Sequence, residues 1–185
     1  MKQYQKILFP VIVALQLCVL FFMITKQELL LAHGAKVLLR CEPIDPRSLF
    51  SGDYVILNYE ISRIGKDIIL NSDLKDIEKI NYLERKDIYV ALMQAEDKHY
   101  RIAAVSDSLD KLKLKYSTII RGRVYYADYD ELRVRYGVES YFVPQREGRK
   151  IEDNMRNVTV EVSVSDNGDS VISKLFIEGE EVKFY

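Results

Sequence analysis

The chain has 185 residues, and its 27 lysines and arginines are balanced by 28 aspartates and glutamates, for a net charge of −1. A nucleic-acid-binding protein would carry a clear basic excess, so nothing in this balance points to nucleic acid as a partner. The length suits one domain beyond a membrane anchor. A soluble part of this size does not need disulfides or a metal for stability.

The first feature along the chain is an apolar run, residues 7–24, broken only by one proline and one glutamine. As a helix it would be about 27 Å long, close to the thickness of a bilayer core of about 30 Å. Lys2 and Lys6 precede the run, which predicts a cytoplasmic N-terminus and an extracytoplasmic domain. We therefore expect a retained transmembrane anchor in residues 1–35, embedded in the lipid bilayer, and a β-rich domain in residues 36–185.

Two other interpretations of this run stay open. A cleaved signal peptide has an apolar core of about 7–15 residues, and this run is longer. However, Ala32-His33-Gly34 is a passable cleavage site with small residues at its ends. A helix buried in a protein core is the third interpretation.

The stretch from Pro43 to Ile61 organises the predicted fold. Asp45-Pro46 is a helix-start signal, because an N-cap carboxylate precedes a residue whose fixed φ suits the first turn. Gly52 should end this short helix with φ > 0, and Asp53 should pair with Arg47 or with backbone donors. A strand follows, and its alternation predicts one inner face. That face comprises Val55, Leu57, Tyr59 and Ile61.

Alternating apolar residues predict further strands joined by turns. One strand, at 36–41, precedes the organising stretch, and three hairpins and a last strand follow it. The strands are expected at 89–93 with 100–105, 116–126 with 132–136, 158–164 with 171–177, and 181–185. Short helices are expected near 72–83 and 148–155. Strands that pair with their neighbours in sequence form antiparallel sheets or barrels, so we predict an all-β or β-rich α+β fold.

The second hairpin carries a specific expectation about its faces. Six apolar residues should share the inner face across a loop of three or five residues: Ile120, Val124, Tyr126, Leu132, Val134 and Tyr136. This register places four arginines on the outer face: Arg121, Arg123, Arg133 and Arg135. Because clustered arginines repel one another, we expect acidic neighbours or a bound partner there.

The third hairpin has the clearest signal. Valines alternate with polar residues from Val158 to Val164, and Asn167-Gly168 is the pattern for a two-residue type I′ turn. The resulting register pairs Val164 with Val171, Val162 with Ser173, Val160 with Leu175, and Val158 with Ile177.

Two short patterns carry a family resemblance. The first matches every fixed position of G-D-Y-x-x-L-x-Y with Gly52, Asp53, Tyr54, Leu57 and Tyr59. The second, at 136–144, includes Gly137, Glu139, Tyr141, Phe142 and Pro144. With Asp45-Pro46-Arg47 upstream, the chain resembles the GDYXXLXY family of small bacterial membrane-anchored proteins. It departs from the family where Gln145-Arg146 follow Pro144, since a Glu-Gly pair is expected there.

The resemblance spans most of the chain and implies an architecture rather than a reaction. It implies a domain outside the bacterial cytoplasmic membrane, attached to that membrane by one helix. Genes of this family often accompany a multi-span membrane protein, so the resemblance also implies a partner of that class.

Residues that could bind a metal or a cofactor are few. His33 and His99 are the two histidines, and the sequence contains neither Cys-x-x-Cys nor His-Glu-x-x-His. Cys18 lies in the apolar run and Cys41 in a predicted strand, so we expect two separate buried thiols rather than a disulfide. No cofactor and no metal are therefore expected.

Two functional hypotheses follow from these residues. In the first, the chain is a non-enzymatic binding or assembly module for another membrane or envelope component, because tyrosine and arginine are enriched at interfaces. In the second, it is an envelope hydrolase that uses Ser48 or Ser51 as a nucleophile, or Asp53 with Glu139 as a carboxylate pair. A nucleophile needs a base within hydrogen-bond reach, and no motif here places a lysine, so no residue is assigned as catalytic.

Overall fold

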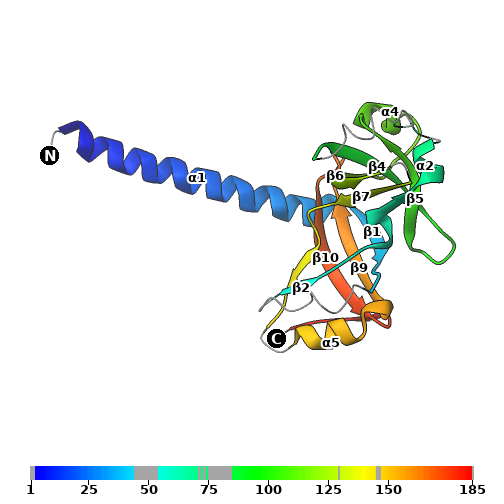
Figure 1. The fold of residues 1–185 in the computed structure, drawn as a ribbon. Helices are drawn as coiled ribbons and strands as arrows, with labels where there is room; N and C mark the ends of the chain where they lie inside the picture. The colour runs from blue at the N-terminus through cyan, green and yellow to red at the C-terminus, as the bar shows by residue number, and fades with distance from the viewer. Residues whose placement is uncertain are drawn as a thin grey trace.

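The computed structural model describes residues 3–43, 54–70, 72, 74, 85–128, 130–144 and 147–184. Figure 1 shows one long N-terminal helix that runs into a β-rich body. The helices are α1 (Gln3–His33), α2 (Lys66–Leu70), α4 (Leu109–Lys113) and α5 (Gly148–Asp153), with 3₁₀ turns η2 (Glu60–Ser62) and η3 (Met155–Asn157). The strands are β1 (Ala35–Arg40), β2 (Tyr54–Ile56), β3 (Arg63–Gly65), β4 (Asp87–Gln94), β5 (Tyr100–Ser106), β6 (Ile119–Ala127), β7 (Glu131–Arg135), β8 (Ser140–Phe142), β9 (Val158–Val164), β10 (Ser170–Ile177) and β11 (Glu180–Glu181).

All strand pairs in the described part of the chain are antiparallel. They form a four-stranded sheet in the order β1-β9-β10-β11, a five-stranded sheet in the order β3-β7-β6-β4-β5, and the two-stranded ribbon β2-β8. Because β1 also lies against β5, the two larger sheets wrap around one core in a nearly closed, barrel-like arrangement. The predicted antiparallel, β-rich fold behind one N-terminal apolar helix is confirmed.

The core follows from the alternation of side chains along the strands. Val37 and Leu39 of β1 are fully buried, and so are Val160 and Val162 of β9, which pair with them. The other sheet contributes its own alternate residues to the same cluster, including Ile120 of β6. A two-residue period thus builds one face of each sheet into a shared interior.

Helix α1 contains one segment that is long and apolar enough to cross a membrane. This segment, Leu8–His33, has a mean hydropathy of 2.5 over its most apolar window, and none of that window is buried. Phe9, Phe21 and Phe22 are among the most exposed large hydrophobic side chains of the described residues. An anchor helix and a signal sequence both have this length and composition, so the helix is suited to a membrane in either role.

The end of α1 is attached to the sheets by a small charged network. Lys26 Nζ lies 2.8 Å from Asp169 Oδ2, and the Arg121 guanidinium lies 2.5 Å from Asp169 Oδ1. Lys36 of β1 also donates to the Leu31 carbonyl at 2.7 Å. Figure 1 shows β6, β7 and β10 next to this end of the helix. The helix is therefore held against the sheets beyond its covalent connection.

A single residue, Gly34, separates α1 from β1. Its N–H donates to the Leu30 carbonyl at 2.9 Å. A side chain here would place its Cβ only 2.6 Å from that carbonyl oxygen and 3.1 Å from Cβ of Ser163. The helix thus passes directly into the first strand through a crowded corner that only glycine fits.

Asp169→Asn is expected to lower the free energy of unfolding of the full chain by about 1 kcal/mol at pH 7, because both ion pairs are partly exposed. The hydrogen bond from Lys26 and the charge of Arg121 hold the pKa of Asp169 below its ordinary value. A depressed pKa contributes stability above the unfolded pKa of about 3.9 and loses it as the pH falls further. Urea unfolding in mild detergent at pH 7 and near pH 3 should show the difference shrinking. Asp166→Asn, three residues earlier in the chain, is the control, and an equal effect there would contradict the prediction.

The third hairpin differs from its predicted register at the turn. Ser165 N–H donates to the Asp169 carbonyl at 2.8 Å, so the loop comprises three residues, 166–168, with Gly168 at φ +84°. Val164 consequently pairs with Ser170, and a bulge at Ser173 returns the pairs beyond it to the predicted register. The pairs Val160–Leu175 and Val158–Ile177 are confirmed, whereas Val164–Val171 and Val162–Ser173 are wrong. A three-residue loop with a left-handed glycine competes closely with the predicted type I′ turn.

The second hairpin is confirmed except at Tyr126 and in its loop. The loop is shorter than predicted, because Asp128 N–H donates to the Glu131 carbonyl at 2.9 Å, which leaves two residues between them rather than three or five. Val124 pairs with Val134, but a bulge at Tyr125 shifts the next pair to Tyr126–Arg133. Tyr126 therefore lies on the outer face and is 42% exposed, against the prediction. The four arginines lie outside as expected, and Asp169, Asp87 and Glu131 are the acidic neighbours of three of them.

The remaining predicted elements have mixed outcomes. The strand at 36–41, the first hairpin and the helix near 148–155 are confirmed by β1, by β4 with β5, and by α5. The last strand is shorter than predicted, because β11 is confined to Glu180–Glu181, although Val182 N–H still donates to the Leu175 carbonyl of β10 at 2.8 Å. The helix predicted at 72–83 falls almost entirely outside the described residues.

Candidate functional site

The extended segment of the first motif buries alternate side chains, as the sequence predicts. Val55, Leu57, Tyr59 and Ile61 are at most 3% exposed, while Tyr54, Ile56 and Asn58 are half-buried and Glu60 is exposed. The regular strand ends at Ile56, but Tyr59 still forms an isolated bridge with Cys41 beside β1. This segment therefore links the ribbon β2-β8 to the edge of the four-stranded sheet.

The second motif forms a turn that its own glutamate closes. Gly137 has φ +81°, a left-handed conformation that disfavours other residues. The Glu139 carboxylate accepts hydrogen bonds from the backbone N–H groups of Tyr136, at 2.5 Å, and of Gly137, at 2.9 Å. Glu139 thus satisfies two turn donors, which explains why a glutamate follows the glycine at this spacing.

The two motifs meet in one layer, which we call the motif seam. It consists of β2, the segment 57–61 and the segment 136–142. Strand β2 pairs with β8, and Leu57 N–H donates to the Glu139 carbonyl at 2.7 Å. Two buried tyrosines then cross the seam in opposite directions. Tyr59 Oη donates to the Val138 carbonyl at 2.5 Å, and Tyr136 Oη donates to the Ile61 carbonyl at 2.6 Å.

Burial determines the chemistry of these side chains. It raises the pKa of Tyr59 and of Tyr136 well above the ordinary phenol value, so both stay neutral hydrogen-bond donors. It also raises the pKa of the neighbouring Cys41 thiol to about 12. A thiol with this pKa is not a nucleophile at neutral pH, which fits the predicted buried, unpaired cysteine. Cys18, by contrast, is exposed on α1 and not buried as expected.

Several predicted site residues fall outside the described part of the chain. These residues are Asp45, Pro46, Arg47, Gly52 and Asp53, together with Ser48 and Ser51 of the hydrolase hypothesis. Of the described motif residues, Tyr54, Tyr141 and Phe142 lie on the ribbon, and Phe142 is 76% exposed, with its ring 6.2 Å from that of Tyr54. Pro144 is exposed and borders a different hollow at the far end of the seam.

A groove of about 600 Å³ runs between the motif seam and the outer face of β7. We call it the arginine groove, because three arginines line it, Arg63, Arg133 and Arg135. The other lining residues are Tyr54, Ile56, Leu57, Asn58, Ser62, Tyr125, Val134, Glu139 and Ser140. Residues of both motifs thus form one wall, and the arginine face of the second hairpin forms the other.

One carboxylate serves two of these arginines. Glu131 Oε1 lies 2.5 Å from Arg133 Nε, and Glu131 Oε2 lies 3.2 Å from Arg63 Nε. Arg135 has no carboxylate partner among the described residues and instead covers the ring of Tyr125, with 4.7 Å from its Cζ to the ring centroid. The groove therefore keeps an excess of positive charge and several guanidinium N–H groups that face no carboxylate of the described chain.

A buried hydroxyl also lines the arginine groove. Ser62 is only 6% exposed, and its Oγ has no hydrogen-bond partner within the described residues. Leaving a buried hydroxyl unpaired costs about 1–3 kcal/mol, so such groups are normally satisfied. The Ser62 oxygen has almost no accessible surface, so it is not a donor that a ligand in the groove can reach. The arginines and the Asn58 side chain that line the groove are donors that suit a negatively charged group with several oxygen atoms.

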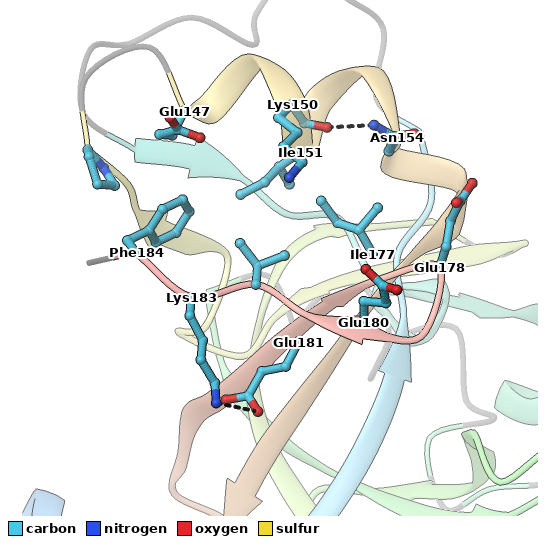
Figure 2. Close-up of a pocket in the computed structure, with 12 residues that line it drawn as sticks. Glu147, Lys150, Ile151, Asn154, Ile177, Glu178, Glu180, Glu181, Lys183 and Phe184 are labelled. Carbon is cyan, nitrogen blue, oxygen red and sulfur yellow. Dashed lines mark hydrogen bonds and ion pairs between the residues drawn. The ribbon is translucent and has the colours of Figure 1, made fainter.

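A second hollow of about 810 Å³ lies beyond the other end of the motif seam, between α5 and the segment 177–184 (Figure 2). It carries both signs of charge. Lys183 lies 3.6 Å from Glu181, and Lys150 contributes its backbone carbonyl to a hydrogen bond from Asn154. No group of three or more metal-binding side chains gathers anywhere in the described residues. With its charges mixed, this hollow favours no particular ligand.

The sequence anticipated some of this site and missed the rest. It placed Arg133 and Arg135 on an outer face and marked Glu139 as a candidate. It gave no sign of Ser62, Arg63 or Tyr125, because a 3₁₀ turn, an edge strand and a bulge bring them to the groove. The opposed pair Arg63–Arg133 is recognised only once the β3-β7 ladder is known; like charges directly across a sheet repel, and here Glu131 lies between them.

The comparisons with known proteins give one match. Residues 16–175 match the family model described as GDYXXLXY protein. No curated protein and no solved structure matches the chain. Since the family model covers most of the sequence and includes both halves of the motif seam, the chain belongs to the GDYXXLXY family.

Proposed function

We propose that this chain is a single-pass membrane-anchored binding protein. Its helix α1 stays in the bacterial cytoplasmic membrane with the N-terminus inside, and its β-rich domain outside binds another component of the membrane or envelope. The arginine groove is the observation that carries the proposal, because both family motifs build one wall of a hollow that is lined by three arginines.

Three features support a binding role over the alternative of an envelope hydrolase. The hydroxyls of Tyr59 and Tyr136 are engaged with backbone carbonyls and serve the fold. The Glu139 carboxylate is engaged with two backbone amides, so its role in the turn accounts for it without a reaction. The exposed arginines and aromatic rings beside the seam are the side chains that dominate binding interfaces.

The anchor and its orientation rest on α1 and its flanks. The apolar segment is exposed from Leu8 to Ile24 and continues without a break into the last turns of α1, where Leu30 is buried and Lys26 contacts Asp169. Cleavage near Gly34 would remove this part of the helix that packs on the sheets. Lys2 and Lys6 at the start of the chain favour retention of that end in the cytoplasm.

Site-specific photo-cross-linking in native membranes tests the proposed function. Benzoylphenylalanine at Tyr125, inside the groove, is expected to give a discrete covalent adduct with one membrane or envelope component. The matched control is the same residue at Leu114, which is 90% exposed on another part of the surface. A protein adduct would be compared with the multi-span class that the family resemblance implies. Absence of an adduct at Tyr125, or equal adducts at both positions, would refute a binding role for the groove.

A further inference from the structure

We propose that the arginine groove binds the phosphate-bearing headgroup of an anionic membrane lipid. This inference rests on the proposed function, because it names the class of component that the groove binds. It combines the chemistry of the groove with its position relative to the end of α1.

The charged groups of the groove suit a phosphate. Two guanidinium groups, from Arg63 and Arg133, converge on the single carboxylate of Glu131 through their Nε atoms. Their terminal N–H groups remain for a ligand, since no other acceptor engages them in the described residues. Arg135 adds a third guanidinium that is oriented by the ring of Tyr125. Arginine's planar fork of donors matches phosphate oxygens and is largely pre-organised when the side chain stacks on a ring.

The groove also has uncharged side chains that can donate hydrogen bonds to the oxygen atoms of a bound phosphate. Asn58 and Ser140 line the groove, and neither is buried, so an anion there can reach their side chains. The groove therefore offers charged donors and neutral donors to the same anion.

The position of the groove favours a lipid as the source of that phosphate. Arg135 precedes Tyr136-Gly137, and these two residues border a hollow of about 240 Å³ together with Lys26 and Gln27 of α1. Gly137 is two residues, or about 7 Å of extended chain, from Arg135. Lys26 comes two residues after the apolar run, where the hydrocarbon core gives way to a headgroup layer of roughly 5–7 Å. A long arginine side chain can extend toward that layer with its charged end in polar surroundings.

Neighbouring contacts hold this arrangement in place. Asp169 joins Lys26 of α1 to Arg121 of β6, and β6 pairs with β7, which carries Arg133 and Arg135. The wall of the groove is thus linked to the helix through a pair of adjacent strands. A lipid in the same leaflet can reach the groove without leaving the bilayer surface, whereas a soluble anion gains nothing from this position.

Native mass spectrometry of the full chain, purified in a non-ionic detergent, tests the assignment. The protein is mixed with equal amounts of phosphatidylglycerol and phosphatidylcholine, which differ in net charge, and the retained lipids are counted. We expect about tenfold preference for phosphatidylglycerol, as for one or two charge-assisted hydrogen bonds. Arg135→Gln and Arg63→Gln should each reduce that preference about fivefold or more. Arg149→Gln, which removes the same charge from exposed α5, should leave it unchanged.

Each other outcome overturns the inference. Equal retention of the two lipids refutes it, and so does a preference that both groove variants keep while circular dichroism shows them folded. Displacement of phosphatidylglycerol by millimolar inorganic phosphate would assign the groove to a soluble phosphate instead. A protein adduct at Tyr125 in native membranes, without lipid preference, would refute the lipid and leave the proposed binding role standing.

Discussion

Tyr59→Ala is expected to destabilise the full chain by about 3–5 kcal/mol, the range for deleting a large buried aromatic side chain. Tyr59 is completely buried at the centre of the motif seam. Its loss would leave a cavity and would also leave the Val138 carbonyl without its hydrogen bond. Since the total free energy of unfolding of a protein is about 5–15 kcal/mol, this single change would remove a large part of it.

The milder substitution Tyr59→Phe separates the two contributions. It keeps the ring and removes the hydroxyl, so the expected cost is about 1–3 kcal/mol for one buried acceptor left unpaired. Urea unfolding in mild detergent, followed by circular dichroism, measures both changes. Tyr126→Phe is the control, because that hydroxyl is on an exposed side chain and its loss should cost about 0.5 kcal/mol or less. Equal effects of Tyr59→Phe and Tyr126→Phe would mean that the seam does not depend on this hydrogen bond.

Gly122→Ala is expected to destabilise the chain by at least about 1–3 kcal/mol through overpacking. Gly122 is buried in the middle of β6, and a Cβ there would overlap with Cγ1 of Val134 and lie 2.9 Å from two ring carbons of Tyr136. The glycine thus makes room for the tyrosine that crosses the seam to Ile61. A glycine inside a strand often marks such a close approach.

Gly65→Ala provides the matched control for this prediction. Gly65 also lies in a strand, but a Cβ there has nothing within 4 Å. Urea unfolding should show it within about 0.5 kcal/mol of the parent chain. The double change Gly122→Ala with Val134→Ala frees space beside the new methyl group, so its cost should be smaller than the sum of the single costs. Strictly additive costs would show that crowding is not the cause.

The errors in strand register show where sequence reasoning stops. Alternation from Val158 to Val164 identified β9 and its buried face correctly, because that pattern depends on one strand alone. The pairing with β10 failed near the turn, since the loop takes one residue more than predicted and the bulge at Ser173 compensates. The bulge at Tyr125 exposes Tyr126 for the same reason. A two-residue period cannot locate a one-residue insertion, and each such insertion reverses the faces beyond it.

The buried residues of the motif seam could be predicted from the sequence, whereas the arginine groove beside it could not. The alternation of Leu57 and Tyr59 placed both in the core, and the second motif marked Gly137 and Glu139 as candidate residues. The arginine groove depends on elements distant in sequence, since Arg63 and Arg133 become neighbours only through the β3-β7 ladder. Pairing between short strands that are distant in sequence leaves no periodic signal in either strand. The groove can therefore be recognised only when the fold is known.

The crowded corner at Gly34 has a consequence for how the protein, anchored as proposed, would meet its partners. A domain on a long flexible stalk samples a volume that reaches far above the bilayer. Here one residue joins helix and sheet, so the domain can only drift sideways with its anchor and stays at one height and one tilt. Encounters then take place in two dimensions, and their frequency depends on the number of partners per unit area of membrane. Confinement of this kind raises the effective concentration of two components without any added contact. Even if the groove binds its partner with low affinity, a partner in the same membrane would therefore occupy it for much of the time.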